Sequence, residues 1–256
     1  MYNLRTYDQW ILWGERERSG KMTKIPMGKH GRATSVTNKQ CWKSFDQAFN
    51  EYLADTKTFQ GVGFCFSEED PFVGIDLDNI RKWNGWEEIV EKLNSYTETS
   101  PSGNGLHIIV EGYLPDERST QKIGSHETGA IEIYDNGRFF TMTLDPIDEN
   151  HMIINRNQDA IEWLANSIDD KKLVNRIMNS NYARKAQLLW EGRWDVAGYA
   201  SHSEADLAFC RILSNINAPM HQIDRIFKKT KLMRNKWNEK RGNNTYGKMT
   251  IEKALE

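Results

Sequence analysis

The chain has 256 residues and a mass of 29.8 kDa, and 38% of its residues are hydrophobic, 11% aromatic and 27% charged. This composition is typical of a folded protein, and the length is sufficient for one large domain or two modest ones. The sequence has no apolar run long enough to span a bilayer and no secretory signal at its N-terminus, which excludes a membrane protein. Its three cysteines lie far apart without a Cys-x-x-Cys pair, which predicts a reduced, cytoplasmic setting.

The net charge of −2 conceals two oppositely charged parts. Residues 1–170 contain 17 Lys and Arg against 28 Asp and Glu, whereas residues 171–256 contain 17 against 8. A basic C-terminal part can bind a polyanion even when the whole chain is slightly acidic, although a solvated basic helix surface would have the same composition.

The first 150 residues are predicted to form short strands, because aromatic and β-branched runs alternate with Gly, Pro, Asn and Ser. The predicted strands are 10–13, 62–66, 72–78, 106–110, 130–134 and 139–143, with helices near 42–54 and 85–95. Strands interrupted by a few helices favour an α+β domain with helices on one side of a sheet.

After about Gln158 the hydrophobic spacing becomes helical. Ser201 and Glu204 fit a capping box, Pro219 suits the first turn of a further helix, and Thr250 is a candidate cap for the last helix. We therefore predict a sheet domain over residues 1–150, a helical linker over 151–190 and a small helical domain over 191–256.

Two carboxylates share one face of the predicted strand 72–78. Side chains alternate along a strand, so Asp76 and Asp78 point to the side opposite Val73, Ile75 and Leu77. Adjacent carboxylates repel each other, and a divalent cation such as Mg²⁺ relieves that repulsion. A solvated strand edge would have the same pattern, because short Asp-x-Asp motifs are common by chance.

A turn rich in Ser and Gly, residues 100–105, precedes the strand that carries His107. Such a turn lets backbone N–H groups and hydroxyls approach a phosphate closely, although a packed histidine after an ordinary turn is an alternative interpretation. The next predicted strand presents Glu132 on the face opposite Ile131 and Ile133. We expect Asp76, Asp78, Glu132 and His107 to meet on the open face of one sheet, as a metal and phosphate site.

These three segments together resemble the motifs of the archaeo-eukaryotic primase superfamily, in particular primase-polymerases encoded by phages and plasmids. The segments are Gly-Ile-Asp-Leu-Asp at 74–78, Ser-Pro-Ser-Gly-Asn-Gly-Leu-His at 100–107 and Ala-Ile-Glu-Ile-Tyr-Asp-Asn-Gly-Arg-Phe-Phe at 130–140. Segments 201–207, 232–237 and 245–247 resemble the small helix-bundle domain of these proteins, so the resemblance extends from about Trp10 to Ala254.

The resemblance implies an RRM-like catalytic sheet packed on an N-terminal α/β module and followed by an all-α helix bundle. It implies that Asp76, Asp78 and Glu132 bind two divalent ions, Mg²⁺ or Mn²⁺. The third acid is Glu132 where much of the superfamily has Asp, so the metal geometry differs by about one methylene.

The resemblance also assigns residues to the nucleotide. It implies that His107 contacts the triphosphate with Ser102 and Gly103, that Arg138 lies near the incoming nucleotide, and that Lys24 belongs to an N-terminal basic motif near the site. The implied activity is synthesis of primers de novo and their 5′-to-3′ extension on single-stranded DNA, from dNTPs, rNTPs or both, in replication of a phage, plasmid or other mobile element. A replicative helicase, in cis or in trans, is an expected partner.

The basic C-terminal part is predicted to bind the template, because cations alternate with aromatics there as in single-strand binders. The predicted DNA contacts are Lys228, Lys229, Lys231, Arg234, Lys236 and Trp237. Residues 242–249 almost match a phosphate-binding loop, but Met249 stands where Ser or Thr would hold Mg²⁺ and no buried strand precedes them, so we interpret them as a loop of the bundle.

Two other functions fit parts of the pattern. A metal-dependent nuclease also uses clustered carboxylates, although the Ser/Gly turn before His107 favours triphosphate binding. A non-catalytic RRM-type module would present aromatics rather than acids on its sheet. A rolling-circle nickase is disfavoured because the sequence has no His-x-His pair. Cys41, Cys65 and Cys210 are far apart and form no Cys-x-x-Cys pair, so we expect packed thiols.

Overall fold

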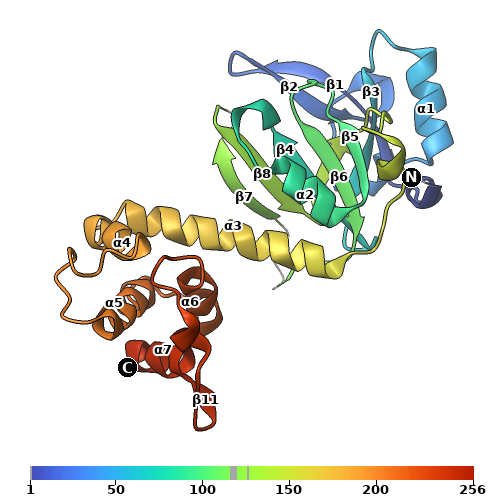
Figure 1. The fold of residues 1–256 in the computed structure, drawn as a ribbon. Coiled ribbons are helices and arrows are strands. Elements are labelled where there is room, and N and C mark those ends of the chain that lie inside the picture. Colours follow the sequence, from blue (N-terminus) through green and yellow to red (C-terminus); the bar gives the residue numbers. More distant parts are fainter. Residues whose placement is uncertain (1, 116–119, 126) are drawn as a thin grey trace. The chain divides into compact units, whose positions relative to one another are not determined.

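The computed structural model describes residues 2–115, 120–125 and 127–256, and it contains two compact units, Met1–Asn166 and Ser167–Glu256 (Figure 1). The first unit combines two antiparallel sheets with helices, which confirms the α+β prediction. In the parts of the chain that the structure describes, no helix is both long and apolar enough to cross a membrane.

One antiparallel sheet contains four strands in the order β2-β1-β3-β9. Its strands are β1 (Trp10–Arg18), β2 (Lys21–Met27), β3 (Gly61–Phe66) and β9 (Arg138–Thr141). Helix α1 (Phe45–Ala54) begins with a capping box between Ser44 and Gln47 and packs its Phe45 ring 4.8 Å from that of Trp10. Strand β9 joins this sheet although it follows the strands of the other sheet in sequence.

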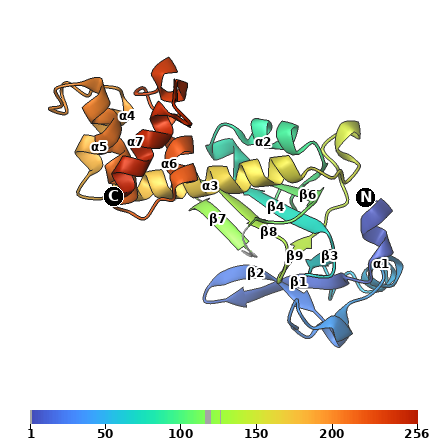
Figure 2. The same ribbon diagram turned by 90° about the horizontal axis from the view of Figure 1, so that it is seen from below.

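The other sheet contains five strands in the order β5-β6-β4-β8-β7. Its strands are β4 (Phe72–Asp78), β5 (Tyr96–Thr99), β6 (Leu106–Glu111), β7 (Thr120–Ser125) and β8 (Gly129–Tyr134), and helix α2 (Trp86–Leu93) connects β4 to β5. Figure 2 shows α2 and the first turns of α3 (Gln158–Met178) on the side of this sheet away from β1 and β2. Ile75, Leu77 and Ile108 point to that side and are buried.

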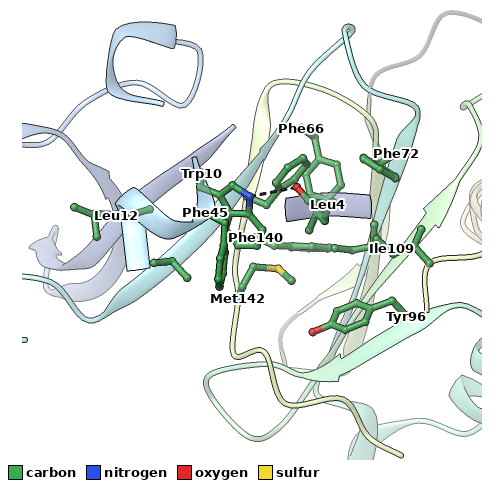
Figure 3. Close-up of a cluster of buried hydrophobic side chains, with 14 of the residues drawn as sticks. Leu4, Trp10, Leu12, Phe45, Phe66, Phe72, Tyr96, Ile109, Phe140 and Met142 are labelled. Atoms are coloured by element: carbon green, nitrogen blue, oxygen red, sulfur yellow. Dashed lines mark hydrogen bonds between the residues drawn. The ribbon is translucent and has the colours of Figure 1, made fainter. Parts of the chain in front are cut away.

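The opposite face of the five-stranded sheet packs on the four-stranded sheet through aromatic rings (Figure 3). Phe66 and Phe140 meet edge to face with centroids 5.1 Å apart. They lie directly over Gly74, where a Cβ atom would come within 2.8 Å of the Phe66 ring. The glycine in β4 therefore allows the two sheets to approach beside the motif 74–78.

The second unit is helical apart from one short hairpin. Its helices are the remainder of α3, α4 (Ala183–Trp190), α5 (His202–Ser214), α6 (Met220–Phe227) and α7 (Tyr246–Leu255), and β10 (Lys240–Arg241) pairs with β11 (Asn244–Thr245). Its core is separate from that of the first unit and includes Phe209, Ile223, Phe227 and Trp237. Short 3₁₀ segments occupy Tyr2–Thr6, Lys29–Gly31, Lys39–Cys41, Ile80–Lys82, Glu149–His151 and Asn235–Asn238.

The caps and boundaries differ in detail from the sequence predictions. Ser201 caps α5 by accepting a hydrogen bond from the Glu204 amide, and Pro219 is the residue before α6. The prediction for Thr250 is wrong: it lies inside α7, and Thr245 caps that helix by accepting from the Lys248 amide. The predicted linker contains helices α3 and α4, and the division between the two units falls within α3.

Candidate active site

A single transverse row of side chains crosses all five strands of the second sheet. Strand pairing places Glu98 opposite His107, His107 opposite Asp76, Asp76 opposite Glu132, and Glu132 opposite Lys122. Directly paired residues of antiparallel strands project to the same face, so these five side chains are neighbours in space. Asp78 lies two residues beyond Asp76 on the same face, opposite Ala130.

Three of the carboxylates on this face are half-buried, whereas the Glu98 carboxylate and the His107 imidazole are covered. Asp76, Asp78 and Glu132 have intermediate exposure, and His107 is only 5% exposed. The imidazole stacks on Phe140 of β9 with centroids 4.3 Å apart and an interplanar angle of 8°. The row therefore lies at the edge of the seam between the two sheets.

Asp76 is the most electrostatically perturbed carboxyl group of the row. Its pKa is raised to about 6, chiefly by burial and in addition by the negative charges of Asp78 and Glu132. His107 and Lys24 act in the opposite direction by stabilising the charged form. A carboxylate whose charge is disfavoured in this way is a natural ligand for an added cation.

Only part of the predicted metal-ligand set is prearranged. Glu132 forms an ion pair with Lys122 across β7 and β8. Among residues 2–115, 120–125 and 127–256, no three His, Cys, Asp or Glu side chains are arranged so that they could hold a metal ion. Asp76 and Asp78 fit a hard cation by the chemistry of their donor atoms and share one strand face, and Glu132 would have to exchange the Lys122 ammonium for that cation.

Lys24 extends from the four-stranded sheet toward the acidic row. Burial lowers the pKa of its ammonium, and the charges of Asp76, Glu15 and Asp78 oppose that change, so the amine lies within electrostatic range of both aspartates. Its Nζ is 5.8 Å from the centroid of the Trp13 ring. The sequence motif around Lys24 is therefore placed beside the carboxylates.

Lys24 also lines a cavity of about 540 Å³, whose lining includes none of the side chains of the row. Its lining includes Trp13, Lys24, Tyr52, Gln60, Ser102 and Leu144. The indole N–H of Trp13 is buried and has no hydrogen-bond partner among the described residues. The cavity thus combines aromatic surface with a cation, which are features that bind nucleotides.

The turn between β5 and β6 brings Ser102 to this cavity. Ser102 Oγ lies 3.1 Å from Ser100 Oγ and accepts a hydrogen bond from the Asn104 amide at 3.3 Å. Gly103 has a φ of +71°, which favours glycine. A Cβ on Gly105 would lie 2.5 Å from the Leu77 carbonyl, so a glycine there lets the turn contact β4 between its two aspartates.

Arg138 is exposed at the start of β9 and pairs with Phe66 in the register of that sheet. Burial raises the pKa of Tyr134, the charges of Asp76 and Glu132 raise it further, and Arg138 lowers it. Arg138 and the carboxylates therefore act on the same tyrosine, although Arg138 forms no ion pair with them among the described residues.

Glu98 is a member of the row that the sequence analysis missed. It is fully buried, and its Oε1 lies 3.1 Å from His107 Nδ1. Its only sequence signal is an acid within the β-forming run Tyr-Thr-Glu-Thr directly before the Ser/Gly turn. A strand assignment there would have paired it with the strand of His107.

The predicted DNA contacts of the C-terminal unit divide into packed and exposed residues. Trp237 is 2% exposed, stacks on Phe227 at 3.5 Å between centroids and donates from Nε1 to Asp224. Its ring is therefore unavailable to a nucleobase, and the prediction for Trp237 is wrong. Arg234 makes two hydrogen bonds, of 3.0 and 2.7 Å, to the fully buried Asp206, which assigns it to the unit's internal structure.

The four predicted lysines retain more exposure. Lys228 and Lys229 form ion pairs with Asp224 and Asp170 and remain about half exposed. Lys231 is exposed, and the Lys236 ammonium donates to Ser203 Oγ and lies 4.4 Å from the centroid of the Tyr246 ring.

A second basic surface borders α4 and α5. A groove of about 840 Å³ is lined by Tyr182, Arg184, Lys185, Tyr199 and Arg211, among others. Within the part of the chain that the structure describes, these three cations have no carboxylate within ion-pair distance, and the Lys185 ammonium lies 5.3 Å from the centroid of the Tyr199 ring. Sequence analysis missed this surface because its residues come from separate helices.

The segment that resembles a phosphate-binding loop has a structural role. Residues 242–249 contain the turn of the β10–β11 hairpin and the first turn of α7. Gly247 packs so closely on Trp237 that a Cβ atom would lie 2.5 Å from its ring. The segment therefore belongs to the helical unit, as predicted, but it forms a hairpin turn and the start of a packed helix rather than a simple loop.

Both the sheet unit and the helical unit are similar to parts of a phage primase-polymerase. The family described as the NrS-1 polymerase HBD domain matches residues 202–256. The whole chain is also similar to the protein named DNA Primase-polymerase of Nitratiruptor phage NrS-1, with 30% identity over 282 aligned positions that include 99% of this chain. The chain spans 36% of the length of that relative. These matches confirm the resemblance to phage-type primase-polymerases that the sequence motifs indicate.

Proposed function

We propose that the protein is a DNA-dependent primase-polymerase that starts primers de novo and extends them 5′ to 3′ on single-stranded DNA during replication of a phage. The observation that carries this proposal is the row in which Asp76 lies between His107 and Glu132, with Asp78 on the same face. The similarity of nearly the whole chain to a named DNA primase-polymerase supports it.

Asp76 and Asp78 would hold the divalent ions, Mg²⁺ or Mn²⁺, with Glu132 as a third ligand once it is released from Lys122. When bound, such ions activate a 3′-hydroxyl and neutralise the leaving pyrophosphate. The raised pKa of Asp76, about 6, supports this assignment because a cation would relieve the repulsion that contributes to it.

The remaining polar residues would orient the nucleotide. His107 would contact the triphosphate from the covered end of the row, and Lys24 and Ser102 would hold phosphate oxygens at the mouth of the 540 Å³ cavity. Gly103 leaves the turn open to such an approach, and Arg138 would act from the start of β9. The cavity aromatics would then contact the nucleoside part.

Primer extension tests the carboxylates directly. With a primed single-stranded template and Mg²⁺ or Mn²⁺, Asp76→Asn and Asp78→Asn should each lose at least about 100-fold in rate, because each removes a charge that the metal ions require. Glu91→Gln, which changes an exposed carboxylate on α2, is the matched control and should leave the rate unchanged. Retained synthesis in both aspartate variants would contradict the proposal.

Unprimed synthesis separates priming from extension. A single-stranded circle incubated with either dNTPs or rNTPs should yield new strands with at least one nucleotide class. Degradation of the labelled circle without nucleotides would instead indicate the nuclease alternative.

We infer that the C-terminal unit binds the template through the groove cations Arg184, Lys185 and Arg211, together with Lys231 and Lys236. If several phosphates are neutralised, the affinity of the full chain for single-stranded DNA should fall steeply with salt. Lys185→Ala combined with Arg211→Ala should flatten that salt dependence, whereas Lys253→Ala, an exposed control on α7, should not. A helicase remains a proposed partner that a pull-down with the phage's replication proteins would test.

A further inference from the structure

The buried carboxylate of Glu98, in the short edge strand β5, is surrounded by hydrogen-bond partners from several parts of the chain. The carboxylate is 0% exposed and accepts from Tyr96 Oη at 2.8 Å, the Thr143 amide at 3.1 Å and the Leu144 amide at 2.9 Å. Its Oε1 also lies 3.1 Å from His107 Nδ1. Burying a carboxylate is costly unless such partners surround it, so this arrangement needs an explanation beyond strand formation.

We infer that Glu98 is a positioning residue that holds the proton on Nδ1 of His107 and thereby directs Nε2 toward the nucleotide. This inference rests on the proposed function, in which His107 contacts the triphosphate. Glu98 is an acceptor for all its other partners, so the shared proton resides on Nδ1. The register places Asp76 on the opposite side of His107, which is the side left to Nε2.

Two contacts together fix both the plane and the rotation of the His107 imidazole. Stacking on Phe140 at 4.3 Å fixes the plane of the ring, and the bond to Glu98 fixes its rotation within that plane. A ring held in both directions presents one nitrogen at a defined position without a loss of rotational freedom when a ligand binds.

The same carboxylate also shapes the wall of the 540 Å³ cavity. Thr143 and Leu144 line that cavity, and Glu98 accepts hydrogen bonds from the backbone amides of both. Leu144 has a φ of +61°, a conformation that bulky residues rarely adopt, and its amide donates to Glu98. Glu98 therefore connects the cavity wall to the orientation of His107.

A double-mutant cycle on dATP affinity tests this inference without relying on catalysis. Calorimetry of the full chain would give the Kd of dATP for the unchanged protein, Glu98→Gln, His107→Ala and the double variant. We expect Glu98→Gln to raise the Kd about tenfold alone but less than about twofold in the His107→Ala background, because its effect passes through the imidazole.

Two different results of the cycle would contradict the positioning role of Glu98 and the nucleotide contact of His107, respectively. Equal effects of Glu98→Gln in both backgrounds, or no effect in either, would overturn the positioning role. No effect of His107→Ala would instead refute the proposed contact of His107 with the nucleotide, so the two failures are distinguishable. Ser95→Ala is the matched control: Ser95 is buried beside the same strand and donates to the Ile109 carbonyl, so its loss should lower Tm but leave the Kd unchanged.

A measurement on the unchanged protein covers the case in which Glu98→Gln does not fold. Long-range ¹H–¹⁵N spectra, assigned with His107→Ala, should show a proton on Nδ1 of His107. A neutral ring protonated only at Nε2 would overturn the inference.

Discussion

The charge of Asp76, which a metal site would use, lowers the stability of the folded protein. Burial and two neighbouring carboxylates raise its pKa to about 6 from an ordinary value of 3.8. The folded state therefore holds a proton on Asp76 more tightly than the unfolded chain does, and ionisation of this group destabilises the fold.

This shift predicts a pH-dependent effect of Asp76→Asn on stability. Above pH 6 and in the presence of EDTA, the free energy of unfolding of the variant should be about 1–3 kcal/mol larger than that of the unchanged protein, so the variant is more stable. The difference should shrink as the pH falls through 6 and vanish only well below the ordinary value of 3.8, where the aspartate is protonated in both states. Urea titrations at several pH values would measure it, and a difference that grows toward low pH would contradict the assigned direction.

Trp237 shows how an aromatic residue in a basic segment can serve packing alone. Its ring stacks on Phe227 and covers Gly247. Trp237→Ala should therefore destabilise the C-terminal unit by about 3–5 kcal/mol, the usual cost of emptying a buried aromatic site. Denaturant unfolding would measure this loss, and a folded variant of unchanged stability that only loses DNA affinity would contradict it.

At the scale of elements, the turn between β5 and β6 depends on its approach to β4. In Gly105→Ala, the new Cβ would lie 2.5 Å from the Leu77 carbonyl, between the two aspartates of β4. We expect a loss of about 1–3 kcal/mol in stability and a weaker affinity for dATP, because the turn and β4 must separate. Gly20→Ala is the control: it has a φ of +77° in open space and should cost stability without changing dATP affinity.

The strands that sequence patterns predicted correctly are mainly interior ones, whereas β2, β5 and β7 were missed. All three lie at sheet edges. Edge strands need no second buried neighbour, so they tolerate charge, Pro and short length, and their hydrophobic pattern is weak. Strand β2, with Lys24 and Pro26, and the four-residue β5, with Glu98, illustrate this.

The sequence correctly predicted that Asp76, Asp78, Glu132 and His107 share one face of one sheet, but it did not predict their order across the strands. Alternation along β4 correctly places Asp76 and Asp78 on one face. The row itself depends on pairing between strands that are distant in sequence, and a slip of one residue would turn Glu132 or His107 to the other face. Glu98 and Lys122 enter the row only through that register.

At the scale of the whole molecule, each unit has its own core, so damage to one should spare the other. Asp206→Ala would leave Arg234 without its buried partner and should destabilise the C-terminal unit by about 3–5 kcal/mol. The dATP affinity of the first unit should not change. Glu239→Ala, which removes an exposed pair with Arg241, is the control and should cost less than about 1 kcal/mol. Denaturant unfolding and calorimetry would measure both effects, and weakened dATP binding in Asp206→Ala would show that the units depend on each other.

The late strand β9 also has a consequence for biosynthesis. It completes the four-stranded sheet by pairing Gly63 with Thr141, after the chain has passed through the entire other sheet. Strand β3 can therefore acquire its second neighbour only after Thr141 has emerged from the ribosome. Shorter nascent chains expose the unpaired, apolar edge of β3. Chaperone binding to stalled nascent chains should accordingly persist until that point and decline after it.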